Sequence, residues 1–255
     1  MYPRNSQIVS GRRLECMQLP GDASRPALVF LHEGLGSVAL WRDFPARVAR
    51  ATGRRAVVYS RLGHGDSDPA PLPRTPRFMH DEALRTLPAL LDRLGIERPV
   101  LIGHSDGASI ALIHAGCAGR PLSGLVAIAP HVFVEDVSVA SIAEARRAFA
   151  ETGLRARMAR YHRDPEATFR GWNDIWLDPA FRDWNIEDVL PGIACPVLVI
   201  QGARDQYGTL AQVDAIEGGV TGRVDRVVLD DARHAPHLEA PEETFAAVVE
   251  FLRRS

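Results

Sequence analysis

The chain has 255 residues, 46% of them hydrophobic, which is enough for one sizeable α/β core with an inserted segment but not for two large domains. Its formal net charge of -2 gives no reason to expect nucleic acid or an anionic membrane as a partner. The 30 basic residues are all arginine, and the lack of lysine excludes Schiff-base and pyridoxal-type catalysis as well as a Walker-type phosphate loop.

The cysteines and the N-terminal residues indicate the cellular compartment of the protein. Cys16, Cys117 and Cys195 lie far apart and have no metal-ligand spacing, which indicates structural thiols in a reducing compartment. Residues 1–11 are polar, and no window of the sequence is long and apolar enough to span a bilayer. We therefore expect a cytoplasmic protein that binds no metal and no membrane; the sequence leaves its oligomeric state open.

Short apolar runs alternate with helical patterns along the chain. The runs are continuously apolar, which is typical of strands buried on both faces. Predicted strands are Ala27–Leu31, Ala56–Tyr59, Val100–Ile102, Leu125–Ala129, Val197–Ile200 and Val227–Leu229, with Arg12–Leu19 as an antiparallel edge strand. Predicted helices are Trp41–Ala51, Phe78–Leu94, Asp106–Cys117 and Pro241–Arg253. The alternation predicts a mostly parallel, doubly wound α/β sheet with helices on both faces.

The alternation stops between residues 131 and 192, where three of the four tryptophans lie. We expect short helices that form an inserted lid between a first core part, residues 1–130, and a second, residues 193–255. One interpretation gives the aromatic side chains a small core of their own. The other places Phe133, Trp172 and Trp176 around an acyl or alcohol pocket, because such pockets are concave and lined by aromatic residues. The two interpretations overlap.

A nucleophile motif follows the third of these main strands. The sequence Gly103-His104-Ser105-Asp106-Gly107 has the G-x-S-x-G pattern and lies between a strand and a helix. Small residues on both sides of the serine permit a strained turn that exposes its hydroxyl. Ser105 is therefore the candidate nucleophile.

A serine hydroxyl needs a base, and the base needs a carboxylate that orients it. Asp205 follows the predicted strand Val197–Ile200, and His234 follows Val227–Leu229. His237 is the competing base, but it lies beyond Pro236, where we expect it to pack or cap a helix. The predicted catalytic residues are Ser105, Asp205 and His234.

An oxyanion hole requires two backbone N–H groups that face the developing negative charge. The amide of Asp106, directly after the nucleophile, is one candidate. The second candidate is the amide of Gly34 or Leu35, in the glycine-rich loop after the strand Ala27–Leu31. The choice between them stays open.

Together these segments resemble the α/β-hydrolase superfamily. The resemblance extends through His32–Gly36, Ser60–Ser67, Gly103–Gly107, the predicted lid, the turn at Asp205 and His234–Pro241. It implies cofactor-free hydrolysis through an acyl-enzyme, and it favours His234 over His237 as the base. It does not imply a substrate, because the fold supports many functions.

Two residues depart from the family pattern. Glu33 stands where relatives commonly have glycine, and Asp106 stands where they commonly have an apolar residue. We expect both carboxylates to face solvent or to accept local hydrogen bonds. In the alternative they approach each other near the oxyanion site, where like charge raises the pKa of one of them and disfavours anionic substrates. Glu33 is included in the predicted substrate pocket.

The expected function is hydrolysis of small-molecule carboxylic esters whose acids are small to medium and largely apolar. One alternative is carbon–carbon bond hydrolysis of ring-cleavage products, for which Arg61, Arg157 or Arg160 would have to bind the substrate carboxylate. A second is a non-catalytic ligand-binding protein of the same fold. Epoxide and haloalkane hydrolysis are disfavoured, because their nucleophile is a carboxylate at the position of Ser105.

Overall fold

The computed structural model describes residues 3–254 and is built on an eight-stranded sheet in the order β1-β2-β4-β3-β5-β6-β7-β8. β2 pairs antiparallel with β1 and β4, and all the other strand pairs are parallel. The strands are β1 Arg4–Val9, β2 Arg12–Leu19, β3 Leu28–Leu31, β4 Ala56–Tyr59, β5 Val100–His104, β6 Gly124–Ile128, β7 Val197–Gly202 and β8 Val224–Leu229. This arrangement confirms the mostly parallel α/β sheet.

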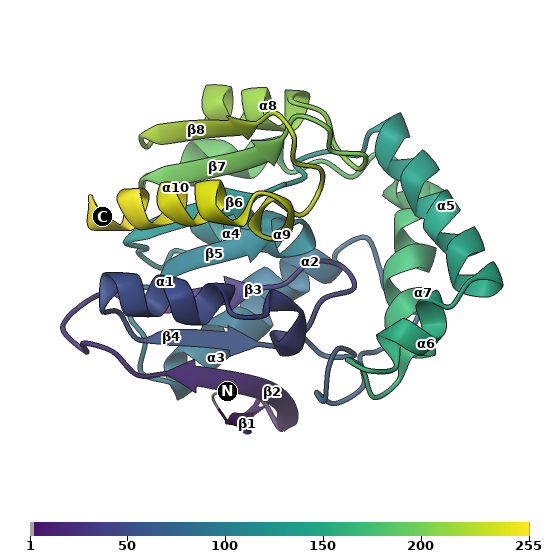
Figure 1. Cartoon of the computed structure of the whole chain (residues 1–255), viewed down its shortest axis with the longest axis horizontal. Coiled ribbons are helices and arrows are strands. Elements are labelled where there is room, and N and C mark those ends of the chain that lie inside the picture. The colour runs from purple at the N-terminus through teal and green to yellow at the C-terminus, as the bar shows by residue number, and fades with distance from the viewer. Residues whose placement is uncertain (1–2, 255) are drawn as a thin grey trace.

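Helices cover both faces of the sheet (Figure 1). They are α1 Phe44–Thr52, α2 Phe78–Asp81, α3 Leu87–Arg93, α4 Asp106–Cys117, α5 Asp136–Glu151, α6 Leu154–Met158, α7 Pro165–Trp176, α8 Ala211–Gly219, α9 Pro236–Glu239 and α10 Pro241–Arg253. Successive side chains of a strand point to opposite faces, so Leu28 and Phe30 of β3 pack in the core beneath α1 and α10, whereas Val29 and Leu31 pack in the core of α3 and α4. The continuous apolar runs arise from this double burial.

Two predicted helices differ in detail. The first begins at Phe44 rather than Trp41, because Arg42 has a φ of 53° that interrupts the helix after a short 3₁₀ turn. The second is a continuous helical run with a π-helical turn at Glu82–Thr86 between α2 and α3. Pro88 lies in the first turn of α3 and has no N–H for an i to i−4 hydrogen bond, which accounts for the wider turn before it.

Three further elements were not predicted: β1, α8 and the short helix α9. Most residues of β1 are exposed, so this strand has no apolar run. Its one sequence signal is the dipeptide Ser10-Gly11, which forms the hairpin turn to β2 with φ values of 48° and 76°; two-residue hairpin turns favour such residues.

Residues 131–192 contain α5, α6 and α7, which lie beyond the carboxyl ends of the parallel strands (Figure 1). Their aromatic side chains pack on one another. The rings of Phe149 and Phe169 stack with centroids 3.9 Å apart, and Phe181 stacks on Trp184 at 5.2 Å. Phe169, Phe181 and Trp184 belong to the same buried cluster as the core of α3 and α4, so the segment shares the main core. The use of the segment as a lid stays a prediction.

Candidate active site

The turn between β5 and α4 places Ser105 at the carboxyl edge of the sheet. Ser105 has φ 53° and ψ −120°, a conformation that costs free energy for a residue with a side chain. The residues two positions before and after Ser105 must be glycine. A Cβ on Gly107 would lie 2.1 Å from the carbonyl oxygen of Leu31, and one on Gly103 would lie 2.3 Å from the carbonyl oxygen of Gly107. The G-x-S-x-G spacing thus follows from backbone packing around the serine.

The three predicted catalytic residues meet at this edge. His234 Nε2 lies 2.9 Å from Ser105 Oγ, and His234 Nδ1 lies 2.9 and 2.8 Å from the two carboxylate oxygens of Asp205. The tautomer that fits has Nδ1–H donating to Asp205, which leaves Nε2 to accept the serine proton. The arrangement can deprotonate Ser105 as its oxygen attacks an electrophile.

Asp205 is fixed from two further sides. Gln201 Nε2 donates to one carboxylate oxygen at 2.7 Å, and the backbone N–H of Tyr207 donates to the other at 2.8 Å. Burial by itself would raise the pKa of Asp205, but the hydrogen bonds from His234 and Tyr207 lower it below its ordinary value. Asp205 therefore stays ionised beside the imidazole.

His237 lies in the core, as expected. Its ring contacts Trp41 with centroids 4.9 Å apart and Phe44 at 5.7 Å. Burial lowers the pKa of His237 to about 3, so it is a neutral packing residue.

The loop of residues 32–36 carries the candidate oxyanion donors and is called the oxyanion loop. Three side chains from distant segments hold it. His64 Nε2 lies 3.0 Å from the carbonyl oxygen of Gly34, and His162 Nε2 donates to that of Leu35 at 2.9 Å. Arg61 Nη2 donates to the carbonyl oxygen of Glu33 at 2.8 Å. In a trans peptide the N–H of one residue points opposite to the C=O of the residue before it, so the Arg61 and His64 contacts set the directions of the Gly34 and Leu35 amides. The choice between the two donors stays a prediction.

A model of the alpha/beta hydrolase family matches residues 28–248. The chain belongs to the alpha/beta hydrolase family. It is 36% identical over 97 residues to an sn-1-specific diacylglycerol lipase of Mus musculus, a match that covers 38% of this chain and 30% of the mouse protein.

Two other likenesses span nearly the whole alpha/beta hydrolase. The dihydrolipoyllysine-residue acetyltransferase component of the acetoin cleaving system of Pseudomonas putida is 28% identical over 265 residues, which cover 96% of this chain and 68% of that one. The crystal structure of the enol-lactonase from Burkholderia xenovorans LB400 superposes with a TM-score of 0.77 and 22% identity over 98% of this chain and all of the other. The second likeness shows the fold alone.

Glu33 is one of the two residues that depart from the family pattern. Its Oε2 lies 3.6 Å from Nδ1 of His104, which is itself buried. Burial by itself would raise the pKa of Glu33, but His104 lowers it below its ordinary value, and Glu33 in turn raises the pKa of His104 against the effect of burial. The two form an ion pair between the oxyanion loop and the nucleophile turn.

Asp106 contradicts the expectation of a solvent-facing or locally bonded carboxylate. It is fully buried, and its Oδ1 accepts a hydrogen bond at 3.2 Å from Nε1 of Trp176, 70 residues away. Its Oδ2 lies 3.7 Å from Nη2 of Arg61. Burial raises the pKa of Asp106, and the nearby Arg61 opposes this shift. Glu33 adds a smaller rise to the pKa of Asp106, in the direction that the alternative of two neighbouring carboxylates predicts. The cation of Arg61 beside Asp106 offsets the negative charge that would disfavour anionic substrates in that alternative.

The predicted pocket residues of the helical segment take different positions. Trp172 packs on the oxyanion loop, where a Cβ on Gly34 would lie 2.2 Å from its indole ring. Trp176 contacts the ring of His131 with centroids 5.2 Å apart and donates to Asp106. Phe133 is tied through its backbone to Gln212. Both tryptophans therefore lie against the site, whereas Phe133 packs against the buried cluster that contains them.

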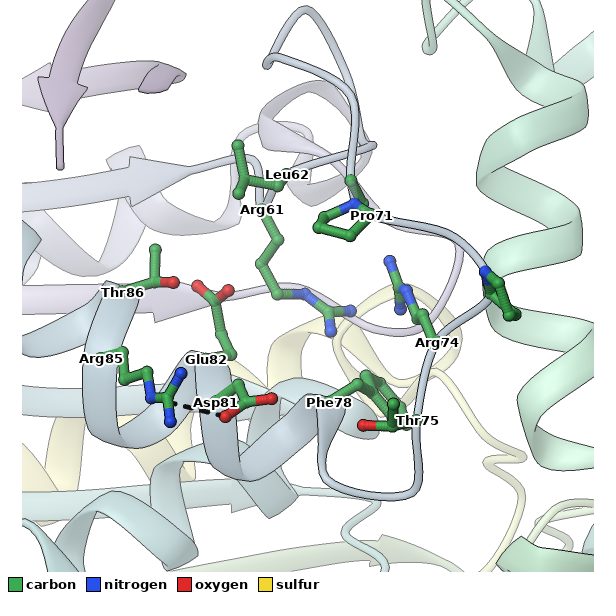
Figure 2. Close-up of a pocket in the computed structure, with 12 residues that line it drawn as sticks. Arg61, Leu62, Pro71, Arg74, Thr75, Phe78, Asp81, Glu82, Arg85 and Thr86 are labelled. Atoms are coloured by element: carbon green, nitrogen blue, oxygen red, sulfur yellow. Dashed lines mark ion pairs between the residues drawn. The ribbon is translucent and has the colours of Figure 1, made fainter. Parts of the chain in front are cut away.

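A cavity of about 320 Å³ is lined by Arg61 (Figure 2). Its wall is formed by the loop after β4 and by the helical run from α2 to α3, and it includes Arg61, Arg74, Phe78 and Glu82. Only Arg61 among these was singled out from the sequence. Arg74 and Glu82 belong to segments without any catalytic motif, so no sequence signal placed them here.

Of the arginines considered for carbon–carbon bond hydrolysis, Arg61 alone is buried, and Arg157 and Arg160 are exposed on or after α6. Among residues 3–254, no group of three or more His, Cys, Asp or Glu side chains is arranged to hold a metal ion. No helix in the same range is long and apolar enough to cross a membrane.

Proposed function

We propose that this alpha/beta hydrolase is a serine hydrolase that cleaves carboxylic esters of small to medium, largely apolar acids. The observation that carries the proposal is the chain of hydrogen bonds from Ser105 through His234 to Asp205. Each neighbouring contact in this chain is within hydrogen-bond distance, which is the geometry required for general-base activation of a serine.

In the proposed reaction, Ser105 Oγ attacks the ester carbonyl carbon and its proton passes to His234 Nε2. The oxyanion that forms is held by the amide of Asp106 and by that of Gly34 or Leu35. His234 then returns the proton to the leaving alcohol, and an acyl group remains on Ser105. A water molecule, deprotonated by His234, attacks the acyl carbonyl, and the acid and free Ser105 are regenerated.

Carbon–carbon bond hydrolysis is a second candidate, and the burial of Arg61 beside Asp106 is the observation that favours it. Its substrates carry a carboxylate that needs a cation near the nucleophile. Both candidates use Ser105, so only their substrates tell them apart. A non-catalytic binding protein has no need for an intact hydrogen-bonded Ser105, Asp205 and His234.

The test combines covalent labelling with turnover. A fluorophosphonate probe should label the wild-type chain at Ser105, as identified by mass spectrometry of its peptides, and should leave Ser105→Ala unlabelled. A panel of 4-nitrophenyl esters from acetate to decanoate should then be hydrolysed with a preferred chain length. Absence of both labelling and hydrolysis would contradict the proposal. Labelling without hydrolysis of any ester, together with cleavage of a vinylogous 1,5-diketone carboxylate, would favour the second candidate.

A further inference from the structure

We infer that the substrate carries a carboxylate remote from the scissile ester, which binds between the guanidinium groups of Arg61 and Arg74. The substrate class is the half-ester of a short dicarboxylic acid. This inference rests on the proposed ester hydrolysis and adds the recognition of one substrate end.

The two guanidinium groups face each other across the cavity of about 320 Å³ (Figure 2). Arg61 is 3% exposed. Its Nε and the Nη1 of Arg74 are buried and have no hydrogen-bond acceptor within residues 3–254. Buried donors without an acceptor are costly, so these two N–H groups are suited to an acceptor that a ligand brings.

The charges around the cavity favour a monoanion. Burial, and then the proximity of Arg61, lower the pKa of Arg74 to about 10, and the nearby Asp106 and Glu82 oppose this shift. Glu82 accepts a hydrogen bond from the hydroxyl of Tyr59 at 2.7 Å. Asp106 accepts from an indole N–H with one oxygen, and its other oxygen lies 3.7 Å from Nη2 of Arg61. A carboxylate supplies two acceptor oxygens with one charge, whereas a phosphate dianion would add a second charge beside these two acids.

The cavity adjoins the proposed reaction centre through Arg61 itself. One nitrogen of this guanidinium, Nη2, donates to the oxyanion loop at Glu33 and lies 3.7 Å from the carboxylate of Asp106, the residue after Ser105. A carboxylate bound to its free Nε is thereby held by the same guanidinium group that contacts the oxyanion loop and Asp106. Leu62, Pro71 and Phe78 add apolar wall to the cavity, which suits a short hydrocarbon chain. Binding of a remote group in this way contributes to substrate selection.

The experiment compares matched substrates. The monomethyl esters of succinic, glutaric and adipic acid are assayed beside their twins in which the free carboxylate is a carboxamide. In the wild-type enzyme, kcat/KM for at least one half-ester should exceed that of its twin at least tenfold, and this ratio should fall as salt is added. Equal values for charged and neutral twins at all three lengths would overturn the inference and leave ester hydrolysis standing.

Variants then locate the effect. Arg74→Gln should lower the ratio at least tenfold, whereas Arg77→Gln, which makes the same change in net charge at an exposed residue outside the cavity wall, should keep the wild-type ratio. An equal loss on both twins in Arg74→Gln would show a structural role and overturn the inference. If Arg74→Gln does not fold, Arg74→Lys replaces it; this change keeps the charge but loses the planar fork, and should retain only part of the preference.

A last measurement separates failure of the inference from failure of the proposed function. If the wild-type chain hydrolyses no ester and takes no fluorophosphonate label, the proposed function fails. Calorimetric titration of Ser105→Ala with monomethyl glutarate then decides the inference alone. Binding that Arg74→Gln weakens and Arg77→Gln does not would support the carboxylate site, and no binding would overturn it.

Discussion

His104 donates a hydrogen bond from Nε2 to the backbone carbonyl oxygen of His234 at 2.7 Å. The residue before the nucleophile thus fixes the backbone of the proposed base, while its other nitrogen faces Glu33 of the oxyanion loop at 3.6 Å. The rings of His234 and His237 also lie against it, with centroids 5.3 and 4.8 Å away. The imidazole of His104, in the nucleophile turn, thus links that turn to the oxyanion loop and to the loop of the proposed base, which are distant in the sequence.

The first prediction follows from this ion pair and its pH dependence. The pKa of His104 is raised, so the stabilisation by Glu33 is fully present below the ordinary histidine value of about 6.5 and is lost as pH rises through the raised value. The pKa of Glu33 is lowered, so the contribution also disappears at strongly acidic pH. Glu33→Gln should therefore lower the free energy of unfolding by about 1 kcal/mol at pH 6 and by much less at pH 9.

Urea unfolding at the two pH values measures this difference. Glu242→Gln is the matched control, because it removes an exposed ion pair with Arg47, and its effect should be the same at pH 6 and pH 9. A Glu33→Gln effect that does not change between the two pH values would show that His104 is neutral in the folded chain.

The second prediction concerns the strained nucleophile. Ser105→Ala should lower kcat by roughly a million-fold, as expected for loss of a triad nucleophile. Ser105→Gly should be equally inactive but more stable than Ser105→Ala by about 1 kcal/mol, because glycine adopts a φ of 53° without steric cost. Ester turnover and thermal unfolding check the two parts. Activity of either variant within about tenfold of wild type would place the chemistry at another residue.

The third prediction separates the two histidines after β8. His234→Ala should be nearly as inactive as Ser105→Ala, because the proton acceptor is lost. His237→Ala should act mainly on folding, lowering the free energy of unfolding by about 2 kcal/mol through the cavity left beside Trp41. Ester turnover and urea unfolding of both variants measure these effects. An inactive His237 variant beside an active His234 variant would reverse the assignment of the base.

The fourth prediction addresses Trp172, which packs on Gly34. Trp172→Ala should change KM and the preferred acyl chain length more than it changes kcat on an acetate ester, because it removes contacts with a remote part of the substrate. Trp184→Ala is the control, since its ring packs on Phe181 within the helical segment, and it should reduce stability without changing chain-length preference. Identical ester profiles for Trp172→Ala and wild type would assign Trp172 to the segment's own core.

The parts of the fold that could be predicted are those that local sequence determines. Central strands are recognisable in the sequence because both of their faces are apolar. The nucleophile turn is recognisable because Gly103 and Gly107 have no room for a side chain, which fixes the glycine spacing. β1 has neither kind of signal, since its side chains are largely exposed and only the Ser10-Gly11 turn marks it.

The surroundings of the site could not be predicted in the same way, because they depend on contacts between distant segments. Asp106 finds its partners in Trp176 and Arg61, and no periodicity or motif relates these three residues. Arg74 likewise reaches the cavity from the proline-rich loop of residues 69–76, which carries no catalytic motif. Burial alone disfavours a charged carboxylate, so the buried position of Asp106 is explained only by its partners Trp176 and Arg61.

The hydrogen bond from His162 to the carbonyl oxygen of Leu35 has a consequence for protein engineering. His162 belongs to the helical segment of residues 131–192, whereas Leu35 follows β3, so the loop of the proposed oxyanion donors is held by a side chain from that segment. Exchange of this segment for that of another family member, as a way to change specificity, would remove the imidazole together with the old substrate contacts. A chimaera that retains a histidine at position 162 should keep its turnover number, and one that lacks it should lose rate on every substrate alike.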